Sequence, residues 1–219
     1  WDGAWDVAFS PDGRYLAVAS TNADAVEIMN VPSLTRVARV SGPSFDGARG
    51  VAFSPDGRYL AVTSPNANAV EIMDVPSLTR VARVSGTDWD YVWGVAFSPD
   101  GRYLAVASHD VDAVEIMRVP SLTRVARVTG ADWDGAWDVA FSPDGRYLAV
   151  TLLFADGVEI MDVPSLARVA RVTGADWDGA WDIAFSPDGR YLAVASSVAD
   201  AVEIMDVPSL TRVARVSGP

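Results

Sequence analysis

Apolar and polar residues alternate over short stretches along the whole chain, and most stretches end near Pro, Gly, Asp or Asn. Alternation with a period of two, bounded by turn residues and rich in Val, Ile, Tyr and Phe, is typical of half-buried β-strands. No window has the 3.6-residue periodicity of an amphipathic helix. The pattern therefore predicts an all-β protein. In the segment 133–176 it predicts strands at about 138–142, 147–151, 158–163 and 168–173.

The whole pattern repeats every 44 residues without an insertion or a deletion. Its most regular marker is a phenylalanine followed by Ser-Pro-Asp-Gly, at Phe9, Phe53, Phe97, Phe141 and Phe185. Four meandering antiparallel strands per repeat, without helices, are the signature of blades in a β-propeller. We therefore expect one β-propeller domain over residues 1–219. Its four-stranded antiparallel blades are expected at approximately 1–44, 45–88, 89–132, 133–176 and 177–219.

Two strings recur in the repeats with few changes, VAFSPDGRYLAVAS and VEIMDVPSLTRVARV. They resemble the WD-repeat and YVTN-type β-propeller families, in which the Ser-Pro-Asp-Gly turn joins the inner strand of a blade to the second. The Trp-Asp pair that closes the third strand of a WD repeat is replaced here by Met-Asp, as at Met73-Asp74, or by a variant. The resemblance covers the whole chain and implies a propeller fold. It implies little about activity, because such folds host many functions.

The 29 acidic residues outnumber the 17 basic ones, which gives a net charge of −12 and a pI near 4.3. Such a surface repels phosphate backbones and anionic lipids, so we expect no nucleic acid and no membrane among the partners. No apolar run reaches the roughly 20 residues that span a bilayer. No targeting signal opens the given chain. We expect a soluble protein, and the sequence indicates no compartment.

Residues that commonly carry catalysis are scarce in this chain. It has no cysteine, and His109 is its single histidine, so no thiolate nucleophile and no repeated histidine-based triad is available. Asp6, Asp138 and Asp182 are placed to ring one mouth of the central channel, but no partner residue in the sequence tunes one carboxylate away from the others. We therefore expect a non-catalytic protein, with no metal site and no cofactor.

Opposite charges recur across the turn between the third and fourth strands of each repeat. If Val31 pairs with Thr35, Glu27 faces Arg39, and in the second copy Asp74 faces Arg80. Opposite-charge pairs on neighbouring strands each contribute roughly 0.2 to 1 kcal/mol. The charge pattern thus supports this register.

The five copies differ mainly in two places: the segment before the first strand of each blade, and the loop between its second and third strands. In a meandering blade both connections emerge at the same end, whereas the turns at the opposite end hardly vary. Loops held by a rigid scaffold commonly carry binding residues, so we interpret the variable end as a surface that recognises a protein. Its candidate contact residues are Arg49, Tyr91, Trp93, His109, Asp110, Leu152, Leu153, Phe154 and Val198.

The sharpest local difference is Leu152-Leu153-Phe154, three bulky apolar residues on an otherwise polar rim. Exposed apolar clusters rimmed by polar groups mark contact sites, and aromatic anchors dominate interface energies. The alternative for Leu152 is that it turns inward to fill the core.

Tryptophans recur at two positions of the repeat, four residues apart. Packing between blades is one explanation. The other is a lectin-like, multivalent carbohydrate binder, in which repeated sites add avidity. The candidate sugar-stacking residues are Trp1, Trp5, Trp89, Trp133, Trp137, Trp177 and Trp181. A third alternative is an engineered or recently amplified repeat propeller that has no natural ligand, which the near-identity of the copies also fits.

Because the given chain begins with the first strand of one blade and ends with the last strand of another, we expect no exchanged strand to close the ring. We expect a monomeric five-bladed ring. The alternative is a larger homo-oligomeric ring, because unpaired edges and surfaces favour assembly.

Overall fold

The structure is a computed structural model that describes residues 3–130, 133–174 and 177–218. Within these residues the strands form five four-stranded antiparallel sheets, which confirms the predicted all-β fold of propeller blades. Short 3₁₀ turns, η1 (Pro43–Phe45) and η2 (Thr87–Trp89), lie in the connections to the second and third sheets.

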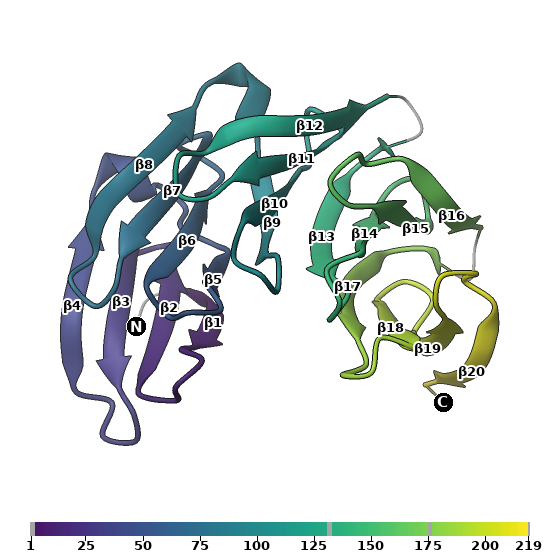
Figure 1. Cartoon of the computed structure of the whole chain (residues 1–219), viewed down its shortest axis with the longest axis horizontal. Helices are drawn as coiled ribbons and strands as arrows, with labels where there is room; N and C mark the ends of the chain where they lie inside the picture. Colours follow the sequence, from purple (N-terminus) through teal and green to yellow (C-terminus); the bar gives the residue numbers. More distant parts are fainter. Residues whose placement is uncertain (1–2, 131–132, 175–176, 219) are drawn as a thin grey trace. The chain divides into compact units, whose positions relative to one another are not determined.

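Each sheet takes its four strands from one repeat, in chain order (Figure 1). The first sheet contains β1 (Ala4–Phe9), β2 (Tyr15–Ser20), β3 (Ala25–Asn30) and β4 (Arg36–Ser41). The second contains β5 (Val51–Phe53), β6 (Tyr59–Ser64), β7 (Ala69–Asp74) and β8 (Thr79–Ser85). The third contains β9 (Val92–Phe97), β10 (Tyr103–Ser108), β11 (Ala113–Arg118) and β12 (Thr123–Thr129). The fourth contains β13 (Ala136–Phe141), β14 (Tyr147–Leu152), β15 (Gly157–Asp162) and β16 (Arg168–Thr173). The fifth contains β17 (Ala180–Phe185), β18 (Tyr191–Ser196), β19 (Ala201–Asp206) and β20 (Arg212–Ser217).

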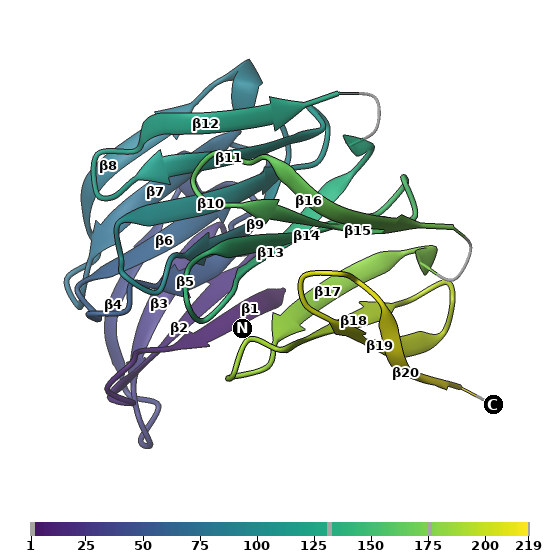
Figure 2. The ribbon, with the colours of Figure 1, turned by 45° about the vertical axis from the view of Figure 1, so that its right-hand side comes forward.

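The chain divides into two compact units. One consists of Trp1–Leu104 with Met117–Thr123, and the other of Ala105–Ile116 with Arg124–Pro219. The first and second sheets therefore lie wholly in the first unit, and the fourth and fifth sheets, β13 to β20, lie wholly in the second (Figure 2). The expectation of a single domain over residues 1–219 stays a prediction.

The strands expected in the fourth repeat are present with small shifts. The last one, β16, has the expected bounds, and β14 extends one residue further than expected, through Leu152. The first, β13, begins two residues earlier than expected, at Ala136. Its register with β14 is irregular between Ala136 and Val139, so pairing continues past an extra residue that period-two alternation does not reveal.

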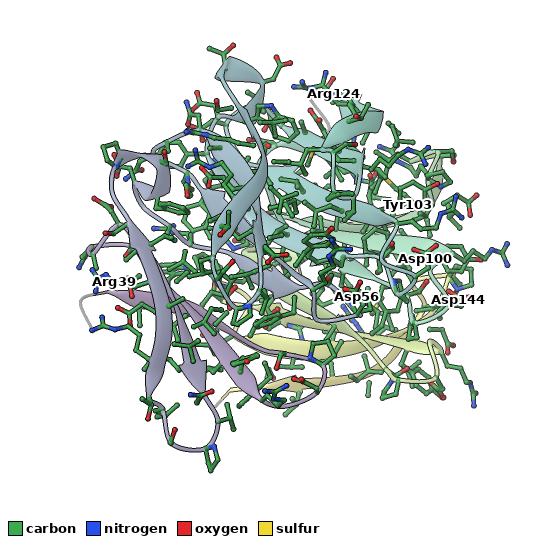
Figure 3. All side chains as sticks on the ribbon, turned by 60° about the vertical axis from the view of Figure 1, so that its left-hand side comes forward. Arg39, Asp56, Asp100, Tyr103, Arg124 and Asp144 are labelled. Carbon is green, nitrogen blue, oxygen red and sulfur yellow. The ribbon has the colours of Figure 1, made fainter. Side chains whose placement is uncertain are left out.

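The Ser-Pro-Asp-Gly turn is held by its own side chains, which explains why every repeat keeps it. In the turn between β5 and β6, Ser54 Oγ donates to Asp56 Oδ1 at 2.6 Å and accepts from the Tyr59 amide at 2.9 Å. Asp56 also accepts from the Arg58 amide, and Gly57 has a φ of 72°, a conformation that favours glycine. Asp56 and its counterpart Asp100 are labelled in Figure 3.

One part of the expected charge register is right and one part is wrong. Glu27 lies opposite Arg39 as predicted, but Arg80 lies opposite Met73 instead of Asp74. The register of β7 and β8 shifts between Ile72 and Met73, which moves Arg80 away from Asp74. Arg80 instead forms an ion pair with the buried Glu71, at 2.9 Å. Because of this irregularity, Arg80 pairs with a buried carboxylate and not with the expected carboxylate of Asp74.

The apolar core lies between successive sheets. In the first unit, the face of the first sheet with Ala17, Ala19, Val26 and Ile28 packs against a face of the second sheet with Val51, Leu60, Val62, Met73 and Leu78. In the second unit the fourth and fifth sheets pack through the corresponding residues. We call the face of a sheet that packs on the following sheet its rear face, and the one that packs on the preceding sheet its front face. No helix among the described residues is long and apolar enough to cross a membrane.

Candidate functional site

The two variable segments of a repeat are hydrogen-bonded to each other. The amide of Thr21, in the loop after β2, donates to Gly3 O at 2.9 Å, and the amide of Leu153 donates to Gly135 O at 2.9 Å. Gly135 has a φ of 73°, and a Cβ there would lie 3.1 Å from the ring of Phe154, so glycine is required at this close approach. The same bond joins Ser197 to Gly179, so the segments that differ most between copies form one composite surface in the first, fourth and fifth blades.

In the first and third repeats, an aspartate at the end of the loop after the second strand also binds the next repeat. Asp24 Oδ1 accepts from the Gly47 amide at 3.0 Å in the first unit. Asp112 Oδ1 accepts from the Gly135 amide at 3.0 Å in the second unit. Neighbouring loops within a unit are thereby held in fixed positions, as a preformed binding surface requires.

In the first unit an arginine is stacked between two tryptophans at the start of the inner strands. The guanidinium carbon of Arg49 lies 4.0 Å from the ring centroid of Trp5 and 3.6 Å from that of Trp93. Burial lowers the pKa of Arg49, although arginine stays charged at neutral pH. Such cation–π contacts contribute about 0.5 to 2 kcal/mol. Arg49 is therefore fixed in place by its neighbours, a stacking that comparison of the repeats alone does not show.

The second unit carries an aromatic cluster formed by His109, Trp137, Phe154 and Trp181. The rings of Trp137 and Trp181 are 4.3 Å apart between centroids. The His109 ring meets Trp137 and Phe154 edge-on, at 5.7 and 5.2 Å. One group of rings thus combines a loop residue of the third repeat, a strand residue and a loop residue of the fourth, and a strand residue of the fifth.

His109 is less exposed than a loop residue suggests. Its side chain keeps only 18% of its accessible surface, because it is packed between two rings, and its Nδ1 contacts a carboxylate oxygen of Asp110. The position of His109 in a variable loop does not reveal this packing. The ring instead supports Phe154 from the side.

The apolar run at residues 152–154 is divided between core and surface. Leu152 is fully buried, so it fills the core, whereas Phe154 is 59% exposed and Leu153 lies between these extremes. Val198, at the same loop position of the fifth repeat, is 64% exposed, and Tyr91, in the segment before β9, is 41% exposed. Phe154 is therefore the accessible aromatic anchor of this loop.

The tryptophans fall into two groups. Trp89, Trp133 and Trp177 are buried, as is Phe45 at the same position, and Trp177 belongs to the core between the fourth and fifth sheets. Their rings are not accessible for stacking on a sugar. Trp5 and Trp181 are exposed, and Trp93 and Trp137 are half-buried. Trp1 lies outside the described residues.

Two carboxylates lie together beside the aromatic cluster. Asp138 Oδ2 accepts from the Ile183 amide at 3.3 Å, and burial, together with the charge of Asp182, raises the pKa of Asp138 to about 7. Asp6 makes the same bond to the next repeat, with the Val51 amide at 2.9 Å, but Gly50 stands where the second carboxylate would be. Asp138 is thus set apart from its copies, contrary to the expectation that nothing tunes one of them. Among the described residues, no group of three or more His, Asp or Glu side chains could hold a metal ion.

Comparisons with known proteins identify the fold and leave the ligand open. Residues 3–164 match the family model described as lactonase, 7-bladed beta-propeller, and residues 168–200 match that of the WD domain, G-beta repeat. No curated protein matches the chain in sequence. Among solved structures, the Kuenenia stuttgartiensis hydrazine synthase is similar, with a TM-score of 0.82 and 22% identity. The match covers 94% of this chain and 63% of that one, and at this identity it shows the fold alone.

Proposed function

The chain belongs to the lactonase, 7-bladed beta-propeller family, and we propose that this member is a non-catalytic scaffold that recognises a protein. The contact surface is the end of the blades where the variable loops lie. The observation that carries the proposal is the aromatic cluster, in which Phe154 is 59% exposed and held from the side by His109. A supported aromatic ring on a rigid loop has the properties of a binding hot spot, because little side-chain entropy is lost on contact.

Two members of the cluster, His109 and Phe154, stand at positions where no other copy has the same residue, which favours one asymmetric site over several equal ones. Positions equivalent to Phe154 hold Asn22, Asn66, Asp110 and Val198. A multivalent sugar site would use positions that recur, but three of the recurring tryptophans are buried. The asymmetry therefore supports a single protein partner over repeated carbohydrate binding.

The charge around Phe154 indicates the chemistry of the partner. Asp110 contacts the supporting histidine. The backbone carbonyl of Asp134 accepts from the Phe154 amide at 3.2 Å, which places a second acidic residue beside the ring, and the whole chain has a net charge of −12. Complementary potentials raise association rates and exclude wrong partners. The partner surface we expect has an apolar pocket or side chain flanked by Lys or Arg.

Phe154→Asn tests the proposal, because the second repeat already has Asn66 at this loop position. A displayed library of random peptides is selected on the wild-type chain, and the dissociation constants of the selected peptides are measured for both proteins. We expect Phe154→Asn to weaken binding about 10- to 30-fold, the range for a hot-spot residue. The control is Val125→Asn, on the outer strand β12, where the side chain is exposed but lies outside the variable loops. It should bind like the wild type.

Three outcomes would overturn the proposal. Peptides that bind Phe154→Asn and the wild type equally would place recognition elsewhere, and saturable binding of glycans at several equal sites would favour the carbohydrate alternative. The family name also makes lactone hydrolysis worth measuring. Hydrolysis by the wild type whose rate depends on a group with a pKa near 7, and that is lost in Asp138→Asn, would show that the chain is an enzyme.

A further inference from the structure

Part of the front face of the first sheet is exposed although its copies are buried, while Val18 and Met29 on the same face retain 5% and 8%. Val7 is 57% exposed and Leu34 is 56% exposed, whereas Val51 and Leu78, at the same positions of the second repeat, retain 5% and 3%. Ala4 is exposed as well, and its copy Ala48 is fully buried. The same side chains thus form a core in the second sheet and a surface in the first.

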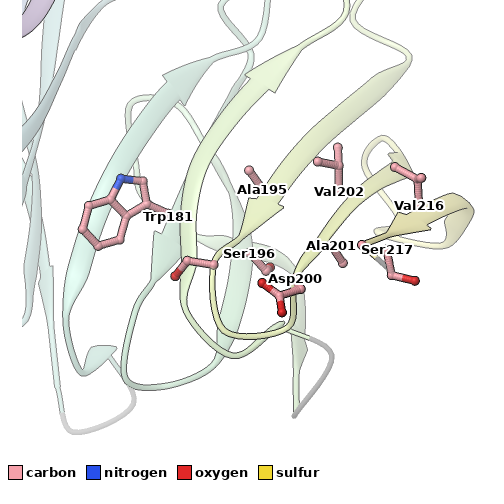
Figure 4. A pocket seen from close by; sticks show the side chains of 10 residues that line it. Trp181, Ala195, Ser196, Asp200, Ala201, Val202, Val216 and Ser217 are labelled. Carbon is pink, nitrogen blue, oxygen red and sulfur yellow. The ribbon is translucent and has the colours of Figure 1, made fainter.

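The rear face of the fifth sheet is exposed in the same way. Val202 is 44% exposed, whereas its copies Val26, Val70, Val114 and Val158 are fully buried. A shallow hollow of about 590 Å³ lies over this face, lined among others by Trp181, Ala195, Val202 and Val216 (Figure 4). Its walls are the side chains that in other repeats pack on a following sheet.

The two exposed faces carry the residues of a junction that the chain already contains. On the fifth sheet, Ala193, Ala195, Val202 and Ile204 repeat Ala17, Ala19, Val26 and Ile28, which form the rear half of the junction between the first two sheets. On the first sheet, Val7, Leu16, Val18, Met29 and Leu34 repeat the front half, Val51, Leu60, Val62, Met73 and Leu78. The faces are therefore complementary in shape and composition, as in packed cores.

Polar groups at the edge of the junction are also present on both sides. Inside the chain, Asp24 accepts from the Gly47 amide and Asp6 from the Val51 amide of the next repeat. Asp200 and Asp182 hold these acceptor positions in the fifth repeat, and Gly3 and Val7 hold the donor positions in the first. The junction would thus have its hydrogen bonds as well as its apolar contacts.

We propose that the rear face of the fifth sheet binds the front face of the first sheet of a second copy of this chain. A second copy carries the matching face by necessity. Such a contact is heterologous, joining two different surfaces head to tail.

The contact would also extend the aromatic cluster. In the first unit, Trp5 stacks on the side chain at the equivalent position of the next repeat, and in the second unit Trp137 stacks on Trp181. Trp181, in the fifth repeat, would then meet Trp5 of the next copy. The contact itself does not depend on the proposed protein recognition, since it uses the sheet faces and not Phe154.

Molar mass in solution, measured by light scattering over a range of concentrations, tests the contact. We expect the wild type to have a mass that is a multiple of the 23.3 kDa of one chain. Leu34→Glu on the front face and Val202→Glu on the rear face should each weaken self-association at least tenfold. The matched controls are Val37→Glu and Val213→Glu, because these valines lie on outer strands and are exposed in the first and last repeats like their copies. They should associate like the wild type.

Mixing the two face variants distinguishes a head-to-tail contact from any other. Leu34→Glu keeps an intact rear face and Val202→Glu an intact front face, so the mixture should form a one-to-one complex of twice the mass of a single chain. Circular dichroism checks that both variants are folded. A wild type that stays at 23.3 kDa at every concentration would mean that the chain does not associate and would overturn the proposal. A mixture that fails to associate while each variant is folded would overturn it as well.

Discussion

At the scale of single residues, Asp138 shows how two copies of one residue acquire different properties. Asp6 and Asp138 both accept a hydrogen bond from the first strand of the next repeat. The next repeat has Gly50 in one case and Asp182 in the other. A second carboxylate nearby disfavours ionisation, and burial acts in the same direction. The pKa of Asp138 is raised to about 7 for these two reasons, with burial the larger.

This elevated pKa makes the stability of the protein depend on pH. An unfolded aspartate has a pKa of about 3.9, so the folded state binds the proton of Asp138 more tightly than the unfolded state. The resulting stabilisation is present below about pH 4 and is lost as the pH rises through about 7. Asp182→Asn lowers the pKa of Asp138, and we expect a smaller loss of stability between pH 4 and 7, by about 1.4 kcal/mol per pKa unit removed.

Urea unfolding at several pH values measures this difference. The control is Asp206→Asn, which also removes one carboxylate and introduces the residue that Asn30 already provides at this position of the first repeat. It should leave the dependence between pH 4 and 7 unchanged. If Asp182→Asn and Asp206→Asn give the same curve as the wild type, the carboxylate of Asp182 does not act on Asp138.

Comparison of the repeats shows which loops vary. It does not show which of their side chains are buried in the core and which are exposed. Leu152 and Phe154 are both large and apolar, yet one is fully buried and the other is largely exposed. Leu152 is the last residue of β14, paired with Gly157, so its orientation follows from the pleat. Phe154 lies beyond the strand end, where alternation no longer applies. Contacts between repeats, such as Arg49 with Trp5, depend on the packing of two sheets and leave no pattern within one repeat.

At the scale of elements, the outer two strands of each sheet are joined by a buried glutamate and two arginines. Glu71 on β7 is fully buried and forms ion pairs with Arg80 at 2.9 Å and Arg83 at 3.4 Å, both on β8. Glu27 on β3 makes the equivalent pairs with Arg36 and Arg39, the latter labelled in Figure 3. Its side chain is 9% exposed, because the front face of the first sheet is uncovered.

Glu71→Gln keeps the shape of this side chain and removes its charge. Hydrogen bonds to charged groups contribute about 1.5 to 3 kcal/mol, and the two arginines can still reach water, so we expect a loss near 2 kcal/mol in the free energy of unfolding. Glu27→Gln is the matched control and should lose less, since its carboxylate is better solvated. The comparison requires urea unfolding at pH 7. Equal losses in both variants would show that burial does not set the strength of these pairs.

At the scale of elements, the sequence predicts some strand bounds closely. The turn residues placed β16 and most of β14 closely, because Pro, Asp and Gly act within a few residues. The charge pairing of β7 with β8 failed at one point, because the register shift at Met73 moves Arg80 by one position. A bulge of this kind has no residue signature in the repeat, whose letters fit the regular register equally well.

At the scale of the whole molecule, the repeat period determines the number of blades and the composition of every junction. It does not determine the rotation between successive sheets, because that rotation depends on small differences in packing between nearly identical side chains. The residues of the chain therefore predict five sheets and their order, which the structure confirms for the described part of the chain. The number of blades in a closed ring, and the number of chains that form it, do not follow from the repeat.

The net charge of −12 per chain gives a further prediction about assembly. Two copies repel each other at long range. The proposed contact joins the front face that carries Leu34 to the rear face that carries Val202, and burial of apolar side chains stabilises it. The screening length falls from about 30 Å at 0.01 M salt to about 8 Å at 0.15 M. We therefore expect the dissociation constant of the wild type, from sedimentation or light scattering, to decrease as sodium chloride is raised over this range. Association through exposed Arg and carboxylate pairs would respond in the opposite sense, since salt weakens such pairs. A dissociation constant that rises with salt would therefore identify charged strands such as β20, and not the apolar faces, as the contact.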